Sequence, residues 1–274
     1  MKTKRILIQS AIFAFIVVLI YYLLCGFSEK LATIASLTLF SGGIAFIILY
    51  TKYILASLSL DNQAAVQLSH LTFNTIIPWS HFSLQPRTIT KILNEIQLRN
   101  PKIIVECGSG VSTIFIAKVL SANGGHLYSI EHEPIWASYI SQIVKTNSLS
   151  PHVTIIHANL VKYSCYGLST LWYDNDVLNS YIPKNSLIDM LVVDGPPHKS
   201  GPMARLMTLQ YFAPLLAPGS LVVLDDYNRS DEKKIVKRWK NYYDLTNHST
   251  IDGRTSFYIF NKNDSHNCNI NSFK

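Results

Sequence analysis

Residues 103–117 constrain the fold more than any other part of the sequence. They begin with an apolar run that is typical of a strand and that ends at an acid, Glu106. Two glycines follow, Gly108 and Gly110, and after them the pattern is typical of a helix. A strand, a tight glycine turn and the N-terminus of a helix form the place where α/β sheets bind nucleotide-like ligands. We therefore expect an α/β sheet with a ligand site at this turn.

Strand and helix patterns alternate along the rest of the chain. Further strands are expected at 126–130, 153–157, 188–193 and 220–224, and an antiparallel pair at 242–251 and 256–260 closes the sheet. Helices are expected at 113–120, 135–146, 204–216 and 231–241, whereas 160–187 has an irregular pattern. This alternation predicts a Rossmann-like fold: a mostly parallel seven-stranded sheet with helices on both faces.

Two uncharged runs precede this domain, at residues 6–25 and 31–51. Each is long enough to cross a hydrocarbon core about 30 Å thick, which predicts a hairpin of two transmembrane helices. Lys2, Lys4 and Arg5 precede the first run and Lys52 follows the second, so both ends are expected in the cytoplasm. The predicted location is the inner (cytoplasmic) membrane, with the following domain facing the cytoplasm. The alternatives are a cleaved signal peptide for the first run, or a buried helical hairpin.

The expected organisation has four parts. Residues 1–55 form the membrane anchor, and residues 56–100 form connecting helices and a lid-like loop at 79–86. That loop holds Trp79, His81 and Phe82, which would serve equally well for plain hydrophobic docking. Residues 101–262 form the α/β domain, and residues 263–274 read as a disordered tail.

Composition excludes some functions. The formal net charge is +7, but no dense stripe of basic and aromatic residues is present, so nucleic acid is not an expected partner. The basic residues at 233–240 are interpreted as a solvated helix face. The four cysteines form no C-x-x-C pair and no metal-binding spacing, which favours a reduced domain in the cytosol.

The glycine turn itself argues against a dinucleotide. A dinucleotide fold has a third glycine, where this sequence has Thr113. The preceding Glu106 also suits a cationic amino-acid ligand better than a pyrophosphate.

Four motifs occur in order: V-E-C-G-S-G-V-S-T at 105–113, S-I-E-H at 129–132, V-D-G-P-P at 193–197 and L-D-D at 224–226. Together they resemble the class I S-adenosylmethionine-dependent methyltransferases, and most closely the bacterial O-methyltransferase-like branch, over about residues 79–260. The resemblance implies that S-adenosylmethionine is the cofactor. Glu131 would bind its ribose hydroxyls, and His132 and Asn159 would lie near its adenine. The turn residues would hold its methionine part: Glu106, Gly108, Ser109, Gly110, Ser112 and Thr113.

Three acids, Asp194, Asp225 and Asp226, stand at the ends of two strands that this topology makes neighbours. They would repel one another unless a positive charge lay between them, and hard cations such as Mg²⁺ take such ligands. The trio resembles the metal site of catechol-type O-methyltransferases, except that Asp226 replaces an amide. Alternatively, Asp225 and Asp226 cap the next helix or bind Arg229.

A metal at this position would favour a deprotonated acceptor hydroxyl. His198 or Lys199 would take the proton, and His198 is preferred because its reference pKa is nearer neutrality.

The aromatic residues of the 160–187 region are the expected acceptor wall: Tyr163, Tyr166, Trp172, Tyr173 and Tyr181. The expected function is that of a membrane-anchored methyltransferase, O-directed, acting on a hydroxylated acceptor that is a sugar, a lipid-linked molecule or an aromatic compound. The alternative is a non-catalytic methyltransferase-like membrane protein that serves as an assembly partner.

Overall fold

The computed structural model describes residues 2–26, 28–165 and 168–261. The chain divides into two compact units, Met1–Leu60 and Asp61–Lys274, which are described separately. The predicted tail at 263–274 and Tyr166 lie outside the described residues.

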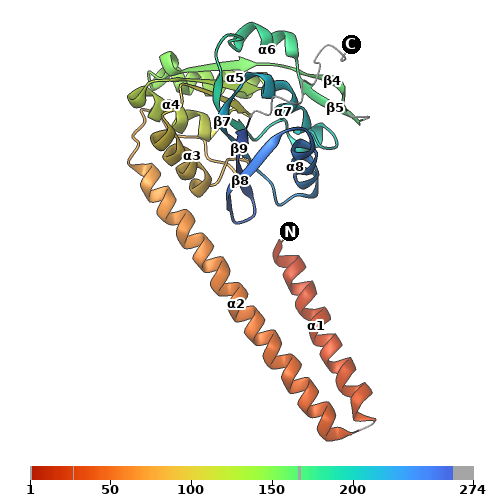
Figure 1. Ribbon diagram of the computed structural model, residues 1–274. Coiled ribbons are helices and arrows are strands. Elements are labelled where there is room, and N and C mark those ends of the chain that lie inside the picture. The colour runs from red at the N-terminus through yellow and green to blue at the C-terminus, as the bar shows by residue number, and fades with distance from the viewer. Residues whose placement is uncertain (1, 27, 166–167, 262–274) are drawn as a thin grey trace. The chain divides into compact units, whose positions relative to one another are not determined.

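The N-terminal unit consists of helix α1 (Lys2–Cys25) and the first part of helix α2 (Glu29–Ser69) (Figure 1). In the part of the chain that the structure describes, only α2 is long and apolar enough to cross a membrane; the apolar part of α1, Ile12–Cys25, is shorter. The predicted hairpin of two spans is therefore wrong, and one long apolar helix takes its place. The helix also continues past Lys52, because helix-forming residues go on after the hydropathy falls.

The second unit contains a mixed seven-stranded sheet with the order β3-β2-β1-β6-β7-β9-β8. The first five strands in this order are parallel, and β9 is antiparallel to both of its neighbours. The strands are β1 (Ile103–Cys107), β2 (His126–Glu131), β3 (Val153–His157), β6 (Ile188–Val193), β7 (Leu216–Leu224), β8 (Asp244–Ile251) and β9 (Thr255–Asn261). The prediction of a mostly parallel Rossmann-like sheet is confirmed.

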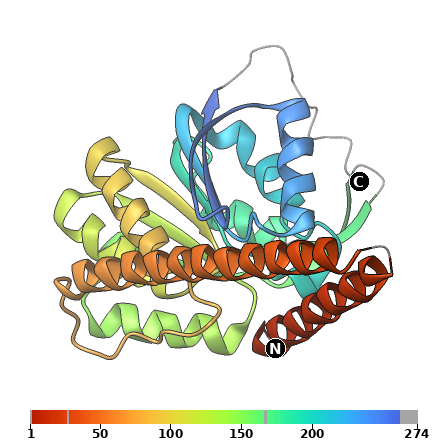
Figure 2. The same ribbon diagram turned by 90° about the horizontal axis from the view of Figure 1, so that it is seen from below.

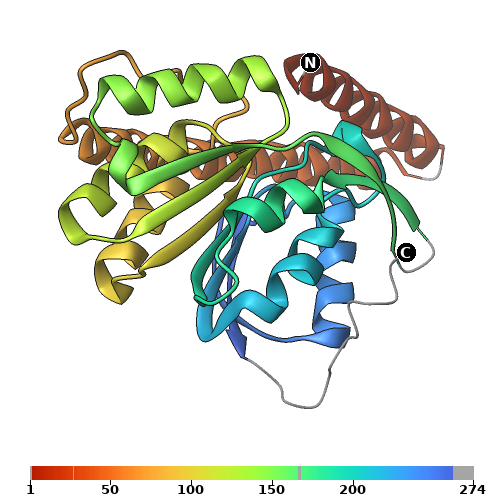
Figure 3. The same cartoon turned by 90° about the horizontal axis from the view of Figure 1, so that it is seen from above.

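Helices cover both faces of this sheet. Buried side chains of α3 (Pro86–Arg99), α4 (Val111–Asn123) and α5 (Pro134–Thr146) form one core cluster, and those of α6 (Asn175–Tyr181), α7 (Leu206–Phe212) and α8 (Ser230–Tyr242) form the other. Figures 2 and 3 show these two groups of helices in different parts of the domain. Short 3-10 helices lie at Ser150–His152, His198–Ser200 and Ala213–Leu215.

Strand β1 lies inside the sheet and is buried on both faces. Ile104 packs into the cluster with α3, α4 and α5, while the next residue, Val105, packs into the opposite cluster. The register pairs Cys107 with Ile130 of β2 and with Val193 of β6. The carboxyl ends of these strands therefore meet at one edge of the sheet.

The region between β3 and β6 is more regular than expected. It forms an antiparallel hairpin, β4 (Leu160–Cys165) with β5 (Leu168–Tyr173), followed by α6 (Figure 3). Two of the aromatic residues expected to line an acceptor site, Trp172 and Tyr173, are fully buried in the core. The expectation of an irregular segment is therefore wrong. The two strands pair along their whole length, and Trp172 and Tyr173 join the hairpin to the core.

Candidate active site

The glycine turn after β1 is packed against the turn after β6. Gly108 has φ +97°, a left-handed conformation that favours glycine, and its N–H donates to the carbonyl of Ile130 at 2.8 Å. A Cβ on Gly108 would lie 3.2 Å from the carbonyl carbon of Asp194 and from the nitrogen of Gly195. The two turns can approach this closely because neither glycine has a side chain.

Glu106 is fully buried at the end of β1, and its carboxylate accepts three hydroxyl hydrogen bonds. Ser112 Oγ donates to Oε1 at 2.5 Å, and Thr113 Oγ1 and Ser129 Oγ donate to Oε2 at 2.5 and 2.7 Å. Burial raises the pKa of Glu106, and the three hydroxyls oppose that rise. The carboxylate and the hydroxyls thus hold the first turn of α4 against β1 and β2.

Thr113 and Ser109 fix the rest of the turn. Thr113 Oγ1 accepts from the backbone N–H of Gly110 at 2.8 Å. Ser109 Oγ lies 2.7 Å from Ser129 Oγ, and the Ser109 carbonyl accepts from Trp136 Nε1 at 2.8 Å. The sequence reasoning missed Ser129 and Trp136. Ser129 could have been found, because it lies two residues before Glu131 on a strand and so shares its face.

Glu131 ends β2 and is buried, and its two carboxylate oxygens have different surroundings. Oε1 accepts from the backbone N–H groups of His132 and Glu133 at 2.8 Å each, and His132 Nδ1 lies 2.8 Å from the same oxygen. Oε2 has no hydrogen-bond partner among the residues that the structure describes. The Ala158 N–H donates to the Glu131 carbonyl at 2.8 Å, which brings the exposed Asn159 to the same edge.

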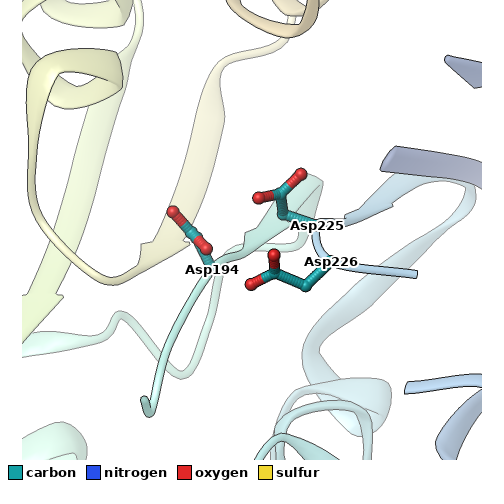
Figure 4. A group of neighbouring side chains, drawn as sticks. All are labelled: Asp194, Asp225 and Asp226. Carbon is teal, nitrogen blue, oxygen red and sulfur yellow. The ribbon is translucent and has the colours of Figure 1, made fainter. Parts of the chain in front are cut away.

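The structure brings the three acids Asp194, Asp225 and Asp226, here called the carboxylate cluster, together at the ends of β6 and β7. One oxygen of each lies within 4.8 Å of the others. Figure 4 shows the three side chains close to one another, with the carboxylate of Asp226 directed toward Asp194. Burial raises the pKa of Asp194 and of Asp225, and nearby arginines oppose that rise.

Arg205, which the sequence reasoning missed, lies within this cluster. Its side chain is 4% exposed, and Nη2 donates to Oδ1 of Asp194 and to Oδ2 of Asp226, each at 3.1 Å. Nη2 also donates to the Asp194 carbonyl at 2.7 Å, and Nη1 donates to the Asp225 carbonyl at 2.9 Å. No local pattern marks Arg205 in the sequence, because it lies outside every strand end.

The other cluster contacts support the alternative for Asp226 that the sequence left open. Arg229 Nη1 lies 2.9 Å from Oδ2 of Asp226, so this acid binds Arg229. Asp225 accepts from Thr255 Oγ1 at 2.5 Å, and Arg254 Nη2 lies 4.0 Å from its other oxygen.

By chemistry the cluster offers the oxygen ligands that Mg²⁺ prefers. The positions of the side chains do not fit a divalent ion, because the guanidinium of Arg205 already contacts Asp194 and Asp226.

His198 and Lys199 lie in the 3-10 helix that follows the turn after β6, and both are exposed. The ring nitrogen Nδ1 of His198 lies 3.9 Å from Oδ2 of Asp231, which is at the start of α8.

Comparison with known proteins identifies the domain that holds this site. A family model described as a methyltransferase domain matches residues 105–227, which run from β1 to just past the carboxylate cluster. The chain carries a class I S-adenosylmethionine-dependent methyltransferase domain. The stated resemblance is thereby confirmed.

Solved structures show the same fold as this methyltransferase domain. An O-methyltransferase from Bacillus cereus in complex with SAH is 17% identical, with a TM-score of 0.50 over 76% of this chain and 91% of that one. The O-methyltransferase TomG from Streptomyces achromogenes, involved in tomaymycin synthesis and in complex with SAM, is 18% identical, with a TM-score of 0.50 over 75% and 90%. An SAH-bound methyltransferase from Podospora anserina is 13% identical, with a TM-score of 0.51 over 73% and 88%.

Proposed function

We propose that this domain binds S-adenosylmethionine at the ends of β1 and β2 and transfers its methyl group to a hydroxyl of a small-molecule acceptor. The observation that carries the proposal is Glu131, whose Oε1 is fixed by two backbone N–H groups while Oε2 has no partner among the described residues. A carboxylate that is fixed through one oxygen and open at the other suits a diol such as the ribose hydroxyls.

The glycine turn supports the same proposal. The first N–H groups of α4 have no partners within their own helix and would attract the carboxylate of the methionine part. Gly108 and Gly110 let the backbone approach this part without side chains in the way. Glu106 would act by holding Ser112 and Thr113 in place rather than by direct contact.

When bound, S-adenosylmethionine supplies a methyl group on a positively charged sulfur. The protein would align the acceptor oxygen with that methyl group and remove the hydroxyl proton. His198 would take this proton, with Lys199 as the second choice. Asn159 and His132 would flank the adenine, because both lie at the same edge as Glu131.

We also propose that α2 anchors the protein in a membrane, with the methyltransferase domain on the cytoplasmic side. The apolar part of α2 is long enough and apolar enough to cross a membrane, and Lys52 follows it. Its 41 residues correspond to about 60 Å of helix, roughly twice the thickness of a hydrocarbon core. Only the apolar part would lie in lipid. Such an anchor would favour a lipid-linked or saccharide acceptor, because an acceptor held in the same membrane would encounter the enzyme more often.

The test is donor binding to the full chain in detergent micelles, measured by isothermal titration with S-adenosylmethionine, followed by methyl transfer to a panel of hydroxylated acceptors. Glu131→Gln is expected to weaken donor binding by about 10- to 100-fold, the range for losing a hydrogen bond to a charged group. Glu133→Gln is the matched control, because this exposed neighbour faces the start of α5.

Each outcome has a distinct meaning. No donor binding by the unchanged protein would reject the proposal. Donor binding without transfer to any acceptor would favour the non-catalytic assembly partner. Equal losses from Glu131→Gln and Glu133→Gln would remove the role given to Glu131.

A further inference from the structure

The carboxylate cluster contains its own cation. Arg205 precedes α7 and is 3% exposed, and its guanidinium lies between Asp194 and Asp226. It also binds the backbone carbonyls of Asp194 and Asp225. One side chain thus joins the turn after β6 to the turn after β7.

Charge balance argues in the same direction. The three carboxylates face three guanidinium groups, those of Arg205, Arg229 and Arg254. Glu232, which lies 3.9 Å from Arg229, adds one further acid. Four acids and three guanidiniums leave little negative charge for a divalent ion to neutralise.

Binding a divalent ion would also disturb a buried group. Asp194 and Asp226 would have to share their carboxylates between the ion and Arg205, which weakens the contacts of a buried guanidinium and places a second cation beside it. Uncompensated buried charges are strongly unfavourable. The repulsion that suggested a metal from the sequence is therefore met by the protein itself.

We propose that Arg205 is the resident cation of the carboxylate cluster and that methyl transfer at this site requires no divalent metal. The statement that methyl transfer requires no divalent metal rests on the proposed function, whereas the role of Arg205 as resident cation concerns the cluster alone. Arg205 is a positioning residue: it fixes the two turns beside the glycine turn and sets the charge of the acids there.

The experiment compares the full-length protein with Arg205→Met, using Mg²⁺ as the probe. Thermal unfolding is followed with and without millimolar Mg²⁺, and binding is measured by isothermal titration. We expect no Mg²⁺ binding and no shift in Tm for the unchanged protein. Arg205→Met should unfold at a lower temperature and should gain stabilisation by Mg²⁺, because its acids then lack their cation. Arg205→Lys, which keeps the charge, should not gain it.

Two further variants keep the test decisive. Arg229→Met is the matched control, because Arg229 binds Asp226 from a more exposed position; it should gain no response to Mg²⁺. If Arg205→Met does not fold, the double variant Arg205→Met/Asp226→Asn removes one acid along with the cation. It leaves two carboxylates and an amide, a set that still suits Mg²⁺.

Mg²⁺ binding by the unchanged protein that is lost in Asp194→Asn would overturn the proposal. So would an absence of Mg²⁺ binding in every variant, since the cluster would then be no cation site. Where methyl transfer is measurable, a chelator should change its rate less than twofold, and loss of the rate with recovery by Mg²⁺ would also reject the proposal. Failure of donor binding would sink the proposed function but leave the Mg²⁺ results readable.

Discussion

The Tyr173 hydroxyl lies where a side chain on Gly195 would otherwise lie. The Tyr173 ring is fully buried in the core, and its hydroxyl has no hydrogen-bond partner among the described residues. A Cβ built on Gly195 would lie 2.3 Å from this hydroxyl. The Tyr173 hydroxyl thus fills the place of a side chain at the turn that supports Gly108.

Gly195→Ala is therefore expected to destabilise the domain by about 1–3 kcal/mol, the usual effect of overpacking a core. Tyr173→Phe should change stability by less than about 1 kcal/mol, because the lost hydroxyl makes no hydrogen bond. Urea unfolding of each protein measures both effects.

The double variant tests the cause. Removing the hydroxyl should recover part of the stability lost in Gly195→Ala; the recovery should be partial, since the Gly108 nitrogen would still lie 3.1 Å from the new Cβ. Gly110→Ala is the control, because a Cβ there would have nothing within 4 Å. Additive losses in the double variant would contradict the assignment.

At this scale, the positions of several candidate residues at one edge of the sheet could be predicted from the sequence for a simple reason. Glu106, Glu131, Asp194 and Asp225 each follow an apolar run, and the ends of parallel strands share one edge. Arg205 and Tyr173 reach the site from outside the strand ends. Their positions depend on how a hairpin and a helix pack, which short sequence patterns do not encode.

At the scale of elements, α3 is joined to β8 through a buried acid. Glu95 binds Lys91 and Arg99 of its own helix at 2.7 Å each, and His248 Nε2 of β8 lies 3.0 Å from it. Burial pushes the pKa of Glu95 upward, but these hydrogen bonds outweigh burial and lower it to about 2. The ionised form is thus favoured in the folded protein.

The sign of the pH dependence follows. Because the folded pKa lies below the unfolded value of 4.5, the stabilisation by Glu95 is complete above that value and is lost as the pH falls toward 2. Glu95→Gln should lower the free energy of unfolding by at most about 3 kcal/mol near neutral pH. Urea unfolding between pH 7 and pH 3 should show this difference shrinking in acid. A difference that stays constant over the range would reject the explanation.

Some helices and strands could be predicted more accurately than others, and the hydropathy of their sequences explains the difference. The core strands are short apolar runs between turn residues, so their type and order follow from pattern. The end of α2 does not follow from the pattern. Hydropathy indicates which residues can lie in lipid, but the helix continues beyond them to Ser69. The β4–β5 hairpin was missed because, among the described residues, it forms a two-stranded sheet of its own, outside the alternation of strands and helices that marks the main sheet.

At the scale of the molecule, the apolar residues of α2 determine where in the cell the protein is expected to be found. Many are exposed in the structure, including Leu37 and Ile47 at 64% and 58%. If α2 is a membrane anchor, the full chain should stay with membranes during alkaline carbonate washing. Leu37→Asp/Ile47→Asp should release it, since each acid in the middle of a span costs about 2.5–3.5 kcal/mol.

Ile76→Asp is the control for this prediction. Ile76 is 91% exposed and lies in the other unit, so the change introduces the same charge away from the apolar run. Release of the unchanged protein by carbonate would reject the anchor and leave the methyltransferase domain unaffected.

The contact between the turns after β1 and β6 also limits how this domain can evolve. A Cβ on Gly108 would meet the backbone of the facing turn at Asp194 and Gly195, and a Cβ on Gly195 would meet the Tyr173 hydroxyl and the Gly108 nitrogen. A side chain added at either glycine would be harmful until a second change compensated for it, whereas loss of the Tyr173 hydroxyl alone would be tolerated. Lineages that have lost one of these glycines should therefore also have lost the tyrosine hydroxyl or altered the facing turn, so that the three positions change together through descent.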